Sequence, residues 1–159
     1  MLMNRVVPCC WPSARTPAVS GASILTFRQS HQTVDPYVEA GMLRTFDGPT
    51  LLFDGVRSVS EYGHTPGMSA YMVESRGQRL LLWGDVVHAS EAQFATPSIS
   101  IDYDVDAPAA IATRKRVLAD AAAQGYLVGG AHLSFPGLGH VAEGDHGYRW
   151  IPQPYTATP

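Results

Sequence analysis

Three side chains that are able to bind a divalent metal each lie in or beside a glycine-bearing turn: His64, Asp85 and His140. Glycine lets the backbone turn sharply, so that a neighbouring side chain can be aimed out of a sheet edge. Two imidazoles and a carboxylate are ligands that zinc-like cations prefer. Their wide separation in the chain excludes a compact zinc finger. We therefore predict a metal site that forms only when a folded scaffold brings the three together.

Each of these side chains also has a purely structural interpretation. His64 could be a structural or solvated histidine of a Gly-Pro turn, Asp85 could cap a loop, and His140 could lie on the surface. Two further histidines, His132 and His88, are candidates for lining a substrate pocket or supporting the ligands, with a structural role as the alternative. The combination of the residues, in this order, is what favours a site.

The elements that must position these side chains are mainly short strands. The chain has strand patterns, some separated by glycine-containing turns, at Thr50–Phe53, Val56–Ser60, Ser69–Glu74, Arg79–Trp83, Tyr126–Ala131 and Tyr148–Ile151. The continuous apolar run Leu80–Leu82 predicts a strand that is covered on both faces. A loop rich in glycine and proline is predicted between Ala131 and Tyr148.

One long helix is predicted over Ala107–Gln124. Asp106 can cap its beginning, Pro108 suits its first turn, and Gly125 can end it. Its apolar residues fall on one side, and we interpret the basic triplet Arg114–Arg116 as part of its solvated face. Strands, a helix and a further strand, in that order, predict an α/β arrangement with the helix packed on a largely β layer.

The first 30 residues differ from the rest and read as an irregular lead-in, followed by a single domain over residues 31–159. A short helix is predicted at Val34–Leu43, ended by Gly41. Cys9 and Cys10 are adjacent, so no disulfide framework is expected. The N-terminal segment is a poor secretory signal, which favours a cytoplasmic location, with an exported or periplasmic one as the alternative.

Composition excludes several classes of function. Only 16% of the 159 residues are charged, 45% are hydrophobic, and the net charge is −3, which argues against nucleic-acid binding through bulk charge. No apolar run approaches the roughly 20 residues that a membrane span needs. The chain has no Gly-x-Ser-x-Gly elbow and no Walker-type loop. A serine hydrolase and a P-loop enzyme are therefore not expected.

The glycine-bearing motifs resemble those of one hydrolase superfamily. The turn Gly63–Gly67 (GHTPG), then Gly84-Asp85, then Ala131–His140 (AHLSFPGLGH) together resemble the metallo-β-lactamase fold. The last run and its continuation to Pro152 are similar to the branch of methyl parathion hydrolases and lactonase-like hydrolases. The resemblance covers roughly residues 35–155.

This resemblance implies the C-terminal half of an αββα sandwich, an α/β fold rich in strands with one long helix. It also implies a two-zinc site at one edge of the sheets, with His64 on the first ion, Asp85 bridging both and His140 on the second. The implied activity is hydrolysis of an ester, lactone or phosphotriester bond in a small molecule by metal-bound hydroxide.

One motif of the superfamily, His-x-His-x-Asp-His, has no counterpart here, since the only histidine before His64 is His31. We therefore expect a truncated form of the fold whose zinc site is incomplete. On its own the chain should have weak or no activity, unless a partner chain or His31 and Asp35 supply the missing ligands. The alternative is a catalytically silent fragment that serves as a homodimerising or interaction module.

Overall fold

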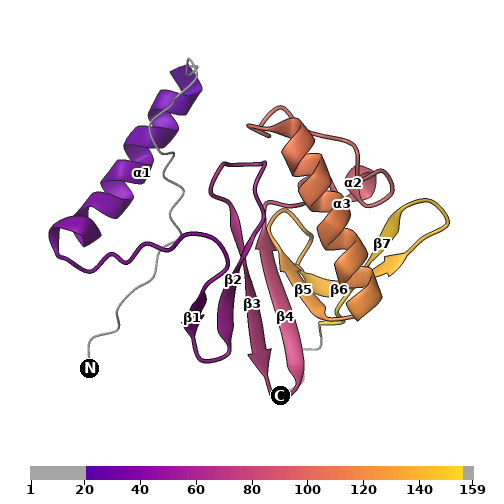
Figure 1. Ribbon diagram of the computed structural model, residues 1–159. Helices are drawn as coiled ribbons and strands as arrows, with labels where there is room; N and C mark the ends of the chain where they lie inside the picture. Colours follow the sequence, from indigo (N-terminus) through magenta and orange to yellow (C-terminus); the bar gives the residue numbers. More distant parts are fainter. Residues whose placement is uncertain (1–20, 156–159) are drawn as a thin grey trace. The chain divides into compact units, whose positions relative to one another are not determined.

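The structure is a computed structural model that describes residues 21–155, with side chains described from Arg28 onward (Figure 1). The chain divides into two compact units, with the boundary between Asp47 and Gly48. Most of the expected lead-in, including Cys9 and Cys10, lies outside the described residues.

The first unit contains the helix α1 (Gly21–Glu39), which is longer than the sequence indicates. It begins well before Val34, so the last third of the segment expected to be irregular is helical. Contacts one turn apart support it, among them the 3.1 Å approach of the His31 ring to the Asp35 carboxylate. Gly41, with a φ of 64°, follows the end of the helix as expected.

The second unit is built on one sheet of seven strands in sequence order: β1 (Leu51–Phe53), β2 (Val56–Ser60), β3 (Ser69–Ser75), β4 (Gln78–Gly84), β5 (Leu127–Gly130), β6 (Leu138–Glu143) and β7 (Tyr148–Pro152). β6 lies where a loop was expected, so that prediction was wrong. A Cβ on Gly139 would overlap the carbonyl oxygen of Ile151. Glycine here permits the close approach of β7 rather than marking a loop.

The strands β4 and β5 run parallel, whereas the other neighbouring strands are antiparallel. Parallel neighbours need a crossover, which here contains α2 (Ser90–Gln93) and α3 (Ala107–Gln124). The C-terminal ends of β4 and β5 therefore meet at one sheet edge, where the amide of Ala131 donates to the carbonyl of Gly84. The residues that follow the two strands, Asp85 and His132 among them, are brought to the same edge.

The helix α3 covers one face of this sheet (Figure 1). Asp106 caps it by accepting from the Ala109 amide, and Gly125 ends it with a φ of 65°, so both predicted signals are confirmed. The core between α3 and the sheet contains Met68, Ala70, Met72, Leu81, Trp83, Val117, Leu118, Ala121, Val128 and Val141. Neither α1 nor α3 combines the length and apolarity that a membrane span requires.

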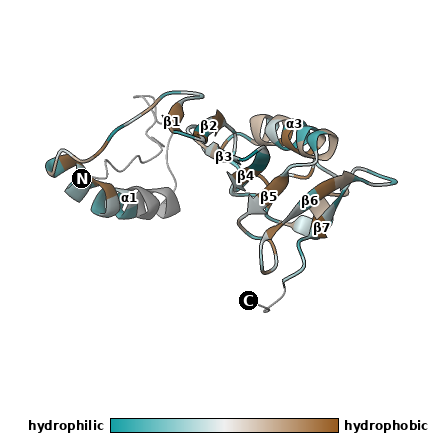
Figure 2. Cartoon of the chain, turned by 90° about the horizontal axis from the view of Figure 1, so that it is seen from below, coloured by the Kyte–Doolittle hydropathy of each residue, from teal (hydrophilic) through white to brown (hydrophobic). Residues whose placement is uncertain are grey.

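The opposite face of the sheet is open within the described part of the second unit, where α3 lies on one side only (Figure 2). Leu81 is buried under α3, while its neighbour Leu82 is 40% exposed on the open face. The prediction that Leu80–Leu82 is covered on both faces is therefore wrong for the described residues. Ile151, on β7, is also 47% exposed.

Candidate metal centre

The turn that carries His64 is fixed against the beginning of α3. The amide of Asp106 donates to the carbonyl of Gly63, and the amide of Val105 donates to the carbonyl of His64, at 2.9 and 3.1 Å. Gly63 has a φ of 131°, and a Cβ on it would overlap the backbone of Ala110. Only glycine fits here, because the turn lies directly on the helix backbone.

The His64 ring is bounded by a carboxylate on each side. Its Nδ1 lies 3.1 Å from Oδ1 of Asp104, whose side chain is fully buried. Its Nε2 lies 3.6 Å from Oδ2 of Asp85, which directly follows β4. The ring is therefore held from behind by Asp104 and turns its other nitrogen toward the sheet edge.

Asp85 stands between two imidazoles. Its second oxygen, Oδ1, lies 3.1 Å from Nε2 of His132, the second residue after β5. The two carboxylate oxygens thus face two different rings, that of His64 and that of His132. Such an arrangement suits a carboxylate that is shared by two cations.

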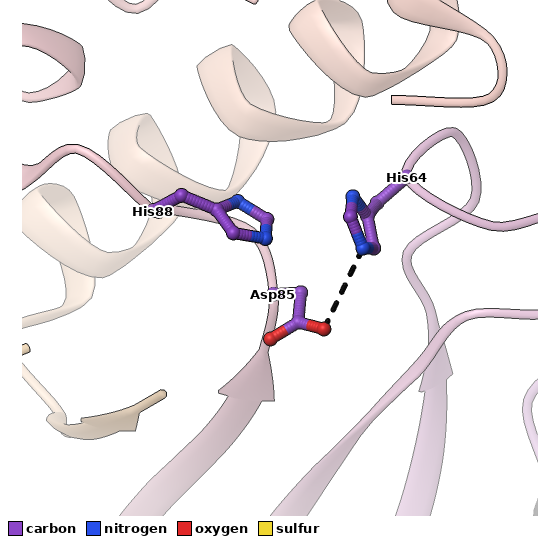
Figure 3. Close-up of side chains that lie close together, drawn as sticks. All are labelled: His64, Asp85 and His88. Atoms are coloured by element: carbon purple, nitrogen blue, oxygen red, sulfur yellow. Dashed lines mark ion pairs between the residues drawn. The ribbon is translucent and has the colours of Figure 1, made fainter. Parts of the chain in front are cut away.

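His88 completes the cluster. Its ring centroid lies 4.6 Å from that of His64 and 4.5 Å from that of His132. One ligand atom from each of His64, Asp85 and His88 lies within 4.8 Å of the others, and Figure 3 shows these side chains pointing toward one another. The segment that carries His88 is held by the buried Gln93, whose side-chain oxygen accepts from the His88 amide at 2.7 Å.

The surroundings of His88 favour its neutral form. Burial lowers the pKa of its ring, and the neighbouring His64 acts in the same direction, against the opposing effect of Asp85. Its buried Nδ1 has no hydrogen-bond partner. An unpaired, neutral imidazole nitrogen beside a carboxylate and further imidazoles is a donor set that fits a zinc ion.

His140 does not lie with this cluster. It belongs to β6, pairs with Ile151, and its Nδ1 lies 3.2 Å from the carbonyl oxygen of Tyr126, just before β5 begins. Asp85 follows the far end of β4, which is separated from β6 by β5. Along the strands it lies roughly 15 Å from His140, at about 3.3 Å per residue. Of the three predicted ligands, the structure brings together His64 and Asp85, and it places His132 and His88 beside them.

The buried pair Asp104 and Arg114 was missed by the sequence analysis. Arg114 is 1% exposed, so the interpretation of the basic triplet as a solvated face was wrong for this residue. Its guanidinium donates to backbone carbonyls and lies 3.5 Å from Oδ2 of Asp104. No local signal separates Asp104 from Asp102 and Asp106, since the three alternate with other residues in one segment.

Solved structures of hydrolases resemble this chain. The hydrolase AbOPH of the beta lactamase superfamily is 31% identical, with a TM-score of 0.78 over 85% of this chain and 46% of its own. AidC, a dizinc quorum-quenching lactonase, is 26% identical, with a TM-score of 0.74 over 84% of this chain and 44% of its own. A probable metal-dependent hydrolase from Staphylococcus aureus, 17% identical, shares the fold with a TM-score of 0.60 over 74% of this chain and 42% of its own.

These similarities establish the class of fold. The chain has the fold of the metallo-β-lactamase superfamily, and the branch that it resembles contains lactonases. The α/β fold class expected from the sequence is confirmed. The chain spans less than half the length of these relatives. No protein-family model matches the sequence, and no curated protein matches it.

Proposed function

We propose that this chain provides part of a two-zinc site in a hydrolase that cleaves ester, lactone or phosphotriester bonds of small molecules. The observation that carries the proposal is the convergence of His64, Asp85 and His132 where β4 and β5 end. The similar protein AidC is a dizinc lactonase and AbOPH is a hydrolase, which supports the metal and the class of reaction.

The chain's own residues would divide the ligand roles among them. Asp85 would be shared, because its two oxygens face different imidazoles, with His64 on one side and His132 on the other. Zinc bound there would polarise the reacting oxygen of the substrate and lower the pKa of a water molecule toward 7. His132 and Asp85 are partly exposed, so substrate can approach the cluster from solvent.

This set of donors is partial. Among the described residues, His64 would bind one ion, His132 would bind the other, and Asp85 would be shared by both, with His88 as an additional donor. A catalytic zinc ion takes three protein ligands. We propose that a partner polypeptide supplies the remaining ligands, and that the chain alone binds zinc weakly. His31 and Asp35, the other candidates, lie beside each other in α1.

A zinc titration of the purified chain tests this proposal, with hydrolysis of an aryl ester and of an organophosphate followed in parallel. We expect weak binding that is lost in Asp85→Asn, and little turnover. Absence of any zinc binding by the wild type contradicts the metal site. Two tightly bound zinc ions per chain contradict the incompleteness of the site.

A silent interaction module is the second candidate, favoured by the open sheet face with its exposed Leu82 and Ile151. Apolar residues on an uncovered face favour association, here as a homodimer. Size-exclusion chromatography with light scattering, combined with the same assays, separates the two candidates. A dimer that binds no zinc and has no activity supports the module, whereas a zinc-binding monomer contradicts it.

A further inference from the structure

A buried ion pair lies behind the metal-binding cluster. The side chains of Asp104 and Arg114 are 0% and 1% exposed, and their charged atoms lie 3.5 Å apart. Arg114 reaches from α3 and donates to the carbonyls of Val86 at 2.8 Å and Ile99 at 2.6 Å. The guanidinium is thus fixed by the backbone, and one of its nitrogens is left facing Asp104.

The two oxygens of Asp104 have different partners. Oδ2 faces Arg114 and the amide of Ile101, which donates to it at 3.3 Å. Oδ1 faces Nδ1 of His64 at 3.1 Å. Because an ionised carboxylate only accepts hydrogen bonds, the Nδ1 of a neutral His64 must carry the proton at this contact.

The other nitrogen of His64 does not compete well for that proton. Its Nε2 lies 3.6 Å from Asp85, beyond the normal range of a hydrogen bond, while the contact with Asp104 lies within it. The lone pair of Nε2 therefore points toward the sheet edge. A buried ion pair is by itself weak evidence that the pair stabilises the fold. The orientation of Oδ1 toward His64 indicates that Asp104 has a further role.

We propose that Asp104, fixed by Arg114, is a positioning residue that holds His64 in the Nδ1–H tautomer and keeps its Nε2 free as a ligand atom. The use of that nitrogen for zinc rests on the proposed function. The tautomer itself does not, because it is a property of the metal-free protein. A result that contradicts the tautomer is therefore distinguishable from a result that contradicts zinc binding.

The first experiment needs no variant of Asp104. Long-range ¹H–¹⁵N NMR spectra of the metal-free wild type report which ring nitrogen carries the proton, and the loss of signals in His64→Gln assigns the ring. The pH is raised until the ring is neutral. We expect the Nδ1–H tautomer. An Nε2–H tautomer, or a rapid mixture of both, overturns the proposal.

The second experiment replaces the acceptor by its amide. In Asp104→Asn the amide oxygen remains the acceptor for Arg114 and Ile101, so the NH₂ group faces His64 and requires an acceptor there. We expect the proton to move to Nε2, which exchanges the two ring ¹⁵N shifts. Asp106→Asn is the matched control, because it removes the same charge two residues away and asparagine caps a helix as well as aspartate. An unchanged tautomer in a folded Asp104→Asn overturns the proposal.

The same pair of variants gives a readout of zinc binding. Loss of a group that orients a metal-binding histidine lowers affinity by roughly 10- to 100-fold. We expect a weakening of that size in Asp104→Asn and none in Asp106→Asn, measured by competition with a chelator. Circular dichroism establishes that each variant is folded. If Asp104→Asn does not fold, the tautomer of His64 in the wild type tests the proposal on its own.

Discussion

Two glycine-bearing segments that look alike in the sequence, Gly63–Gly67 and Gly137–His140, have different surroundings in the fold. The first leaves the sheet, lies against the backbone of α3, and directs His64 to the ends of β4 and β5. The second enters β6, where His140 is one residue of a paired strand. A glycine that permits a turn and a glycine that permits a close strand approach are therefore different signals.

The physical difference lies in what each glycine contacts. A Cβ on Gly63 would overlap α3, whereas a Cβ on Gly139 would overlap β7. The first position attaches a loop to a helix and places a functional side chain. The second lets two strands pack, and the direction of the histidine that follows is set by the alternation of the strand.

The largest expected effect comes from Gly63→Ala. The added methyl group overlaps the Ala110 backbone, and the φ of 131° is unfavourable for alanine. We expect a loss of about 3 kcal/mol or more in the free energy of unfolding, because neither backbone can move without disturbing the other. Urea denaturation followed by circular dichroism measures it.

Gly77→Ala is the control for that substitution. Gly77 also has a positive φ, 74°, but a Cβ there has open space around it. Its cost should be only about 1 kcal/mol, from backbone strain alone. Equal losses in the two variants would show that contact with α3 does not determine the conformation of the His64 turn.

The histidines themselves provide the next comparison. We expect His64→Ala and His132→Ala each to weaken zinc binding by more than about 100-fold, since a direct ligand should matter more than a supporting group. His140→Ala should leave zinc affinity unchanged and cost only about 1 kcal/mol of stability, through its contact with Tyr126. Calorimetric titration of the three variants measures this. An equal loss of zinc affinity in His140→Ala would show that His140 belongs to the metal site.

Local signals in the sequence predicted the elements well. Asp106 and Gly125 mark the ends of α3, and the turn at Asp54-Gly55 marks the first hairpin, because caps and tight turns depend on a few adjacent residues. His64 and Asp85 were predicted for a similar reason, since each lies beside a glycine in a segment that follows a strand.

The remaining part of the site depends on pairing between distant strands. His132 directly follows the predicted strand Tyr126–Ala131, as Asp85 follows Arg79–Trp83, and a parallel pairing of those strands brings the two residues together. The sequence alone did not establish that pairing, and the glycines that precede His140 favoured that residue instead. The burial of Arg114 was missed because its partners are carbonyls of the crossover, which carry no sequence signature.

A pH effect is expected at the base of the His64 turn. Burial raises the pKa of Glu61 from 4.5 to about 7, against the opposing effect of its partner Arg116. Because the folded state holds this proton more tightly, the stabilisation is present below about pH 4.5 and is lost as the pH rises to about 7. Relative to Glu61→Gln, the wild type should lose on the order of 2 kcal/mol between pH 5 and pH 8. Urea denaturation at both pH values measures it, and parallel curves would contradict the assignment.

The smallest expected effect tests whether the position of the His64 turn depends on the stability of α3, the helix to which the turn is attached. In Asp106→Ala the side-chain cap of α3 is lost, at a cost of about 1 kcal/mol. The backbone amide of residue 106 still donates to the carbonyl of Gly63, so the turn should keep its position and zinc affinity should not change. The exposed Asp102, replaced by alanine, serves as the charge control. A tenfold weaker zinc affinity in Asp106→Ala alone would mean that the turn depends on the cap as well as on the backbone contacts.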